Sequence, residues 1–142
     1  MPTSAELPQV LADTSVAVAL VVADHEHHKL ASDAMRGRQI GLAGHAAFET
    51  FSVLTRLPPP LRRTPLAVQR ILGRDFPASC FLSAEATRDL HGRLAGLGIA
   101  GGAIYDALVA AAAVEHRLPL ATLDRRAIET YRVLDAEVEL LR

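Results

Sequence analysis

The chain has 142 residues, of which 50% are hydrophobic and 22% charged, and its fifteen basic and sixteen acidic side chains leave a net charge of −1. These values favour one compact domain and exclude a disordered, fibrous or globally basic chain. Cys80 is the only cysteine, which excludes a disulfide framework. The apolar run at residues 14–23 is too short to span ~30 Å of membrane, and no basic stretch precedes it, so we expect a cytoplasmic protein.

The first half of the chain is predicted to alternate strands with helices. Short apolar runs at residues 7–12 and 39–43 are typical of buried strands. Pro58–Pro60 ends an apolar helical stretch, because proline cannot continue the hydrogen-bond ladder of a helix. The helices predicted in this half cover residues 15–22, 24–36, 45–57 and 66–72.

The second half repeats this alternation. The predicted order is a strand at 79–82, helices at 83–97 and 103–116, a strand at 120–123, a helix at 125–131, and short strands at 133–134 and 138–141. Strands that alternate with helices predict an α/β domain with a mainly parallel sheet. We expect a single domain over residues 1–142, in which residues 1–7 form a leader without a motif.

Four carboxylates occupy positions that suggest a site. Asp13 and Asp124 each follow a predicted strand, and ligands of open parallel sheets gather beyond the carboxyl ends of the strands. Glu49 and Asp106 lie inside otherwise apolar helices. Each acid also has a structural explanation: the two strand-end aspartates as helix N-caps, Glu49 on a solvated face, and Asp106 as a partner of the helix dipole.

The chemistry changes if folding brings these acids together, since they are 36, 57 and 18 residues apart. Two carboxylates ~4 Å apart repel by about 4 kcal/mol at an effective dielectric of ~20. A cluster must therefore take up protons or bind a divalent cation, and oxygen ligands favour Mg²⁺ or Mn²⁺. Such an ion serves phosphoryl chemistry, because it orients and neutralises a phosphate.

Four segments carry a resemblance to a known family: residues 10–15 (VLADTS), Glu49, residues 104–111 (IYDALVAA) and residues 121–125 (ATLDR). Together they resemble the PIN domain and, more narrowly, the VapC toxins of type II toxin–antitoxin pairs. The resemblance implies a three-layer α/β/α sandwich. It also implies an endoribonuclease that uses Mg²⁺ or Mn²⁺ and leaves a 5′-phosphate and a 3′-hydroxyl.

The same resemblance assigns roles to individual residues. Its catalytic and metal-binding acids would be Asp13, Glu49, Asp106 and Asp124, and the polar residues that support them would be Thr14, Ser15 and Thr122. Family members often carry an aromatic residue three positions after the fourth acid, where this chain has Ala127. The implied partners are RNA, a VapB-type antitoxin and a second copy of the chain.

Two surfaces are candidates for contact with these partners. Residues 56–74 contain five arginines and no acid, and we expect them to bind RNA phosphates; they are Arg56, Arg62, Arg63, Arg70 and Arg74. The alternative is a solvated face in an arginine-rich chain, since Lys29 is the only lysine. The apolar helices at 15–22 and 45–57 are expected to form a groove for an amphipathic antitoxin helix.

Other interpretations remain open at this point. His25, His27 and His28 suggest a zinc site, although a solvated helix start explains them better. A receiver domain would need a lysine late in the chain. A non-catalytic RNA-binding or scaffold protein would share the fold, and a DNA nuclease would share the acids. Only four Phe and two Tyr are present, so the sequence gives little support for base stacking along a single strand.

Overall fold

The computed structural model describes residues 7–142, so most of the predicted leader lies outside the described residues. Four strands form one sheet: β1 (Gln9–Ala12), β2 (Gln39–Leu42), β3 (Leu120–Thr122) and β4 (Val138–Leu140). Their order is β2-β1-β3-β4, and all three neighbouring pairs are parallel. The parallel sheet expected from the alternating pattern is confirmed.

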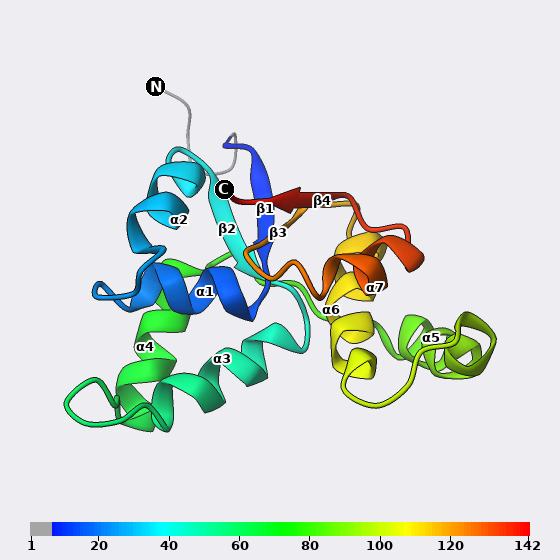
Figure 1. Cartoon of the computed structure of the whole chain (residues 1–142), viewed down its shortest axis with the longest axis horizontal. Helices are drawn as coiled ribbons and strands as arrows, with labels where there is room; N and C mark the ends of the chain where they lie inside the picture. The colour runs from blue at the N-terminus through cyan, green and yellow to red at the C-terminus, as the bar shows by residue number, and fades with distance from the viewer. Residues whose placement is uncertain (1–6) are drawn as a thin grey trace.

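Helices lie on both faces of this sheet (Figure 1). Within residues 7–142 they are α1 (Thr14–Val21), α2 (His28–Met35), α3 (Ala46–Thr55), α4 (Pro65–Asp75), α5 (Ala84–Leu97), α6 (Ala103–Glu115) and α7 (Ile128–Val133). Leu11 of β1 packs into a core with α5, α6 and α7, whereas its neighbours Val10 and Ala12 pack with α1 and α2. Because side chains alternate along a strand, the sheet separates two helical layers, which confirms the α/β/α sandwich.

Helices α3 and α4 extend the molecule beyond the carboxyl end of β1 (Figure 1). A separate buried cluster of Val22, Leu54 and Val68 joins the end of α1 to both of them. The apolar sides of α1 and α3 therefore pack against each other and against α4. The groove expected there for an antitoxin helix stays a prediction. Among the described residues, no helix combines the length and hydrophobicity needed to cross a membrane.

Hydroxyl side chains cap the starts of helices α4 and α5. The hydroxyl of Thr64 accepts a hydrogen bond from the Ala67 N–H at 3.2 Å, and Ser83 does the same for the Ala86 N–H at 3.1 Å. These side chains satisfy backbone donors that the first turn of a helix leaves free. Helix α4 runs three residues further than the predicted end at 72 and finishes at Asp75.

The prediction of a strand at 79–82 is wrong, because this segment forms no regular strand. This segment forms one isolated bridge, between Ala43 and Cys80, and otherwise runs irregularly beside β2. The Ser79 hydroxyl accepts from the Leu42 N–H at 2.8 Å and so takes the place of a backbone partner. A Cβ at Gly41 would lie 2.0 Å from the carbonyl oxygen of Ala78, so the close approach requires glycine there.

Three further boundaries differ from the prediction. The second helix begins at His28 rather than at residue 24, because the preceding residues form turns. The last helix covers Ile128–Val133 instead of 125–131. The strand predicted at 133–134 is wrong, because Val133 ends this helix and the Leu134 N–H donates to the Thr130 carbonyl at 3.3 Å. Strand β4 matches the strand predicted at 138–141.

Candidate active site

The carboxyl ends of β1 and β3 bring two of the predicted acids to one edge of the sheet. The chain passes from β1 to β2 on one side and later crosses back to place β3 on the other side of β1. The strand order therefore reverses at β1, and ligands of such sheets bind at the carboxyl edge beside that point. Ala12 pairs with Ala121 in the ladder, and the Asp13 N–H donates to the Ala121 carbonyl at 3.1 Å. Asp124 follows β3 by two residues and is exposed.

Asp13 is held by a network of donors. Its side chain is only 3% exposed. Oδ1 accepts from the Ser15 hydroxyl at 2.5 Å and from the Val16 N–H at 3.2 Å, while Oδ2 accepts from the Tyr131 hydroxyl at 2.9 Å. Burial raises the pKa of Asp13, and the hydrogen bonds from Ser15, Thr122 and Tyr131 partly oppose that rise. Asp13 is therefore an N-cap, as its structural explanation predicted, but its second oxygen is bound as well.

Ser15 and Thr122, two of the predicted supporting residues, tie the strand ends together. The Ser15 hydroxyl donates to Asp13 and also accepts from the Leu123 N–H at 2.9 Å. The buried Thr122 hydroxyl accepts from the Asp124 N–H at 3.0 Å. These bonds fix the position of Asp124 relative to Asp13, although the two residues are far apart in the sequence.

The other two acids come from the first turns of helices. Glu49 lies in the first turn of α3, where its Oε2 accepts from the Thr14 hydroxyl at 2.9 Å. Its Oε1 lies 3.4 Å from Nε2 of His45. Asp106 lies in the first turn of α6 and is half-buried. Carboxylates at these places are favoured by the positive ends of the helix dipoles.

The electrostatics of Asp106 show that the four acids share one neighbourhood. Burial and the charges of Asp124, Glu49 and Asp13, in that order, together raise its pKa from 3.8 to about 6. Burial and the Asp13 carboxylate likewise raise the pKa of the Tyr131 hydroxyl. Within residues 7–142, however, no three His, Cys, Asp or Glu side chains form a compact metal-binding group. The acids therefore converge without forming a closed set of ligands.

Comparisons with known proteins agree with this arrangement. The family model for the PIN domain matches residues 10–133. The chain belongs to the PIN-domain family. It is 47% identical over 131 residues to ribonuclease VapC27 of Mycobacterium tuberculosis, covering 92% of this chain and 96% of that protein. Ribonuclease VapC40 of the same species is also 47% identical over 131 residues, with 91% and 96% covered.

Two solved structures share the PIN fold. VapBC2 from Rickettsia felis, bound to a DNA fragment from its promoter, has a TM-score of 0.68 and 14% sequence identity, and the match covers 94% of this chain and 99% of that one. FitAcB from Neisseria gonorrhoeae has a TM-score of 0.65 and 15% identity, with 91% and 95% covered. At this identity the likeness concerns the fold.

Tyr131 belongs to the candidate site, although the sequence pattern did not indicate it. Ala127, at the position where an aromatic residue was expected, is 1% exposed and lies in the core. Tyr131 lies one helical turn further on, in α7, where it is 2% exposed and reaches Asp13. A pattern search that allowed a shift of one helical turn would have found it.

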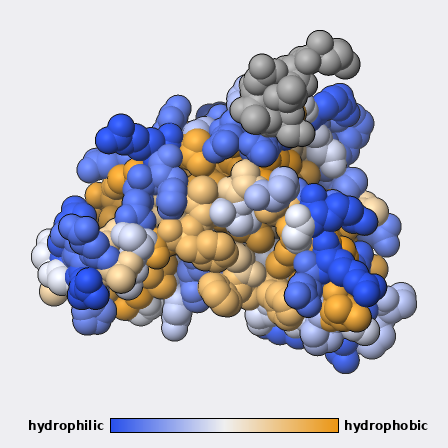
Figure 2. Space-filling view, turned by 180° about the vertical axis from the view of Figure 1, so that it is seen from behind, coloured by the Kyte–Doolittle hydropathy of each residue, from blue (hydrophilic) through white to orange (hydrophobic). Residues whose placement is uncertain are grey.

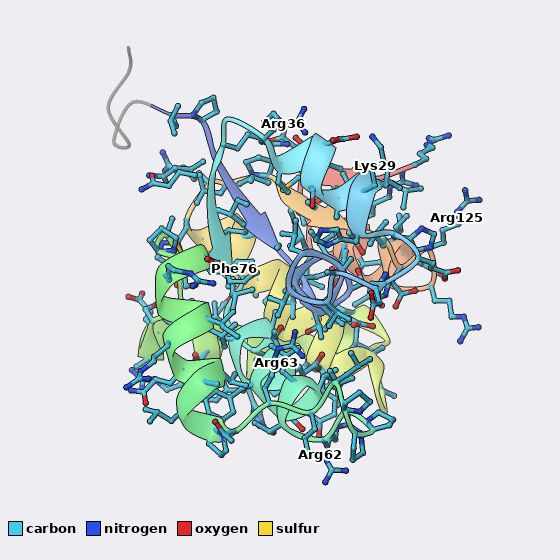
Figure 3. The ribbon with its side chains drawn as sticks, turned by 90° about the vertical axis from the view of Figure 1, so that its left-hand side faces the viewer. Lys29, Arg36, Arg62, Arg63, Phe76 and Arg125 are labelled. Atoms are coloured by element: carbon cyan, nitrogen blue, oxygen red, sulfur yellow. The ribbon has the colours of Figure 1, made fainter. Side chains whose placement is uncertain are left out.

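The predicted arginine surface extends from the end of α3 through the following loop into α4. Arg62 and Arg63 lie between α3 and α4, and each donates to a nearby backbone carbonyl, of Leu57 and Leu61 respectively. Arg62 points away from the body of the protein (Figure 3). Arg74 pairs with Asp75 at 2.8 Å, just outside the acid-free segment. The role of the five arginines in binding RNA stays a prediction.

Exposed aromatic side chains form a rim beside the helix-borne acids, which the composition had not led us to expect. Phe48, Phe81 and Tyr105 are 67%, 50% and 52% exposed. Phe48 meets Phe81 edge-on at 6.3 Å, and Tyr105 stacks on His45 at 5.0 Å between ring centroids. An apolar band also crosses the middle of the rear face of the molecule, between hydrophilic ends (Figure 2). Apolar area of this kind commonly marks an interaction surface.

Proposed function

We propose that this protein is an endoribonuclease that hydrolyses RNA in the cytoplasm and acts as the toxin of a toxin–antitoxin pair. The observation that carries the proposal is the convergence of Asp13, Glu49, Asp106 and Asp124 at the carboxyl edge of the sheet, expressed in the raised pKa of Asp106. The 47% identity to ribonucleases VapC27 and VapC40, over nearly the whole chain, supports the same reaction.

The donor set suits Mg²⁺ or Mn²⁺. All four side chains are carboxylates, which are the hard oxygen ligands that these ions prefer. The repulsion from neighbouring charges that raises the pKa of Asp106 supports a cation at this place. We propose that these four residues hold the ion. When bound, it supplies a Lewis acid for the phosphodiester and a countercharge for the carboxylates.

The protein's own groups have separable tasks in this proposal. Ser15, Val16 and Tyr131 hold both oxygens of Asp13 in one orientation, so that this carboxylate is positioned before substrate arrives. Thr14 does the same for one oxygen of Glu49. The repulsion from Asp124, Glu49 and Asp13 that helps to raise the pKa of Asp106 is the charge that a bound cation would offset. The products expected are a 5′-phosphate and a 3′-hydroxyl.

A cleavage assay tests the proposal. The protein is stripped with EDTA, then given Mg²⁺ or Mn²⁺ and a randomised RNA pool, and the ends of the products are mapped. Asp106→Asn should lower the rate at least a hundredfold while the protein stays folded, whereas Asp89→Asn on the exposed part of α5 should not change it. RNA binding without metal-dependent cleavage would instead indicate a non-catalytic RNA-binding or scaffold protein. Equal cleavage of DNA would indicate a nuclease that does not distinguish RNA from DNA.

We also propose that the protein binds a VapB-type antitoxin and forms a homodimer. Support comes from the VapC names of the relatives and from the exposed aromatic rim, which a partner would bury. Co-expression with the neighbouring small open reading frame should give a stable complex with reduced cleavage. Light scattering of the separate protein measures its oligomeric state. Failure to form any complex would contradict the toxin assignment without affecting the cleavage assay.

A further inference from the structure

A groove outside the four acids opens directly beside them. It has a volume of about 450 Å³, within the range of ordinary ligand sites. Thr14, Ser15 and Asp124 belong to both the groove and the acidic site. The rest is lined by side chains that have no task in the proposed reaction, chiefly His25, His27 and Arg126.

The first wall is the turn between α1 and α2, which was predicted to be helical. The His27 N–H donates to Nδ1 of His25 at 3.0 Å, and the two imidazole centroids lie 5.7 Å apart. His28, by contrast, has a structural task, because its Nδ1–H donates to the Ala19 carbonyl at 2.8 Å and fastens the turn to α1. The turn therefore presents two neighbouring rings from a fixed backbone.

The opposite wall is the segment that follows β3. The Asp124 carboxylate accepts from the Arg126 N–H at 2.9 Å, which fixes the backbone that carries this arginine. Its neighbour Arg125 lines a different cavity, with Ile128 and Arg132, and its side chain extends into solvent (Figure 3). Two adjacent exposed arginines thus serve different surfaces, and only Arg126 faces the groove beside the acids.

The chemistry of the two walls matches the two parts of a nucleotide. Imidazole rings stack on bases, and a guanidinium binds phosphate oxygens with paired donors. Glu26, which pairs with Nε2 of His27 at 3.4 Å, adds an acceptor at the histidine end. That carboxylate repels a phosphate but can accept from the amino group of a base.

We propose that this groove is a nucleotide subsite that binds the residue next to the scissile phosphate, with its base against His25 and His27 and its phosphate at Arg126. The proposal rests on the ribonuclease function above and adds to it a source of sequence preference. Because Asp124 lines the groove and also belongs to the acidic site, a nucleotide seated in the groove places the adjoining phosphodiester beside that acid.

The test uses variants that remove the histidine rings and the guanidinium without disturbing the fold. His25→Asn with His27→Asn removes both imidazoles and keeps an acceptor for the N–H that closes the turn. Arg126→Ala removes the guanidinium, and Arg125→Ala is its matched control. His91→Ala, in the exposed part of α5, controls for loss of a histidine. Thermal melting checks that every variant is folded.

Cleavage of a randomised RNA pool, followed by sequencing of the cut sites, gives the decisive readout. The wild type should prefer certain bases at one position beside the cut. The double histidine variant should lose that preference, and Arg126→Ala should lower kcat/KM at least tenfold, mainly through KM. Arg125→Ala and His91→Ala should stay within twofold of the wild type. Unchanged preference and kcat/KM in both groove variants would overturn the proposal.

A binding measurement keeps the subsite testable if the wild type cuts no RNA. In that case the ribonuclease function fails, and the affinity for a labelled single-stranded RNA is measured by fluorescence anisotropy in EDTA. The groove variants should then bind at least fivefold more weakly than the two controls. Equal binding by all five proteins would reject the subsite as well. If the groove variants lose antitoxin binding but keep RNA affinity and base preference, the groove belongs to a protein partner instead.

Discussion

Asp13 and Asp106 belong to the same acidic site, yet the fold surrounds their carboxylates in opposite ways. Asp13 is 3% exposed and accepts hydrogen bonds on both oxygens from residues of α1 and α7. Asp106 is half-buried in the first turn of α6, and the influences that raise its pKa are burial and three neighbouring negative charges. Asp13 is thus part of the core, whereas Asp106 lies where the negative charges of the site come together.

This difference separates stability from chemistry. Polar groups in the core stabilise the fold only while all their partners are present, so changes around Asp13 should cost stability. Clustered like charges destabilise the fold because they repel one another. Removing the charge of Asp106 should therefore raise the stability of the folded state while it removes activity.

The largest stability effect is expected from Tyr131→Phe. This change removes the hydroxyl that donates to Oδ2 of Asp13 and leaves a buried carboxylate oxygen without that donor. The free energy of unfolding should fall by about 1–3 kcal/mol. Chemical denaturation measures the loss, and Tyr105→Phe, where the ring is 52% exposed, should change it by less than about 0.5 kcal/mol. Equal losses in the two variants would show that the Asp13 network does not support the fold.

A smaller effect of opposite sign is expected from Asp106→Asn in EDTA. The pKa of Asp106 is raised to about 6 in the folded state, whereas the unfolded chain ionises near 3.8. Ionised Asp106 therefore destabilises the fold above pH 6, and this cost disappears as the pH falls from 6 toward 4. The variant should be more stable by about 1 kcal/mol at pH 7.5, a value reduced because solvent screens a half-buried charge.

Melting curves across this pH range check the sign. The gain of Asp106→Asn should shrink below pH 6, and added Mg²⁺ should stabilise the wild type more than the variant, since a ligand that binds only the folded state raises its stability. Asp89→Asn, whose carboxylate pairs with Arg93 on α5 at 3.5 Å, should show neither trend. A destabilised Asp106→Asn protein at pH 7.5 would contradict the accumulation of charge at this position.

The strand-end half of the site could be largely predicted from the sequence. An apolar run followed by Asp13-Thr14-Ser15 indicates both a buried strand and a helix N-cap, and the structure contains both. Parallel strands place their carboxyl ends at one edge, so Asp13 and Asp124 were expected together. The alternation of strands and helices was enough for this inference, because it depends on local patterns and on one topological rule.

The partners of these acids could not be predicted in the same way. The bond from Tyr131 to Asp13 joins residues 118 positions apart, and its geometry depends on how α7 packs against the sheet. The turn at residues 24–27 reads as a helix because its polar residues fit a helical start, and the hydrogen bond to the His25 ring that closes it has no signature in the sequence. Side-chain acceptors of this kind become visible only in the folded structure.

The smallest expected effect concerns the side from which RNA approaches the helix-borne acids. Arg62→Ala with Arg63→Ala removes two charges between α3 and α4, near the helix that carries Glu49. If both arginines bind phosphates, the affinity for single-stranded RNA should fall about threefold to tenfold. The slope of the logarithm of the binding constant against the logarithm of the salt concentration should become shallower by roughly 1.4. Arg88→Ala with Arg93→Ala, in α5, removes the same charge elsewhere and should leave that slope unchanged. An unaltered slope in the first variant, beside a reduced one in Arg126→Ala, would place the RNA along the groove that Arg126 lines and not beside α3.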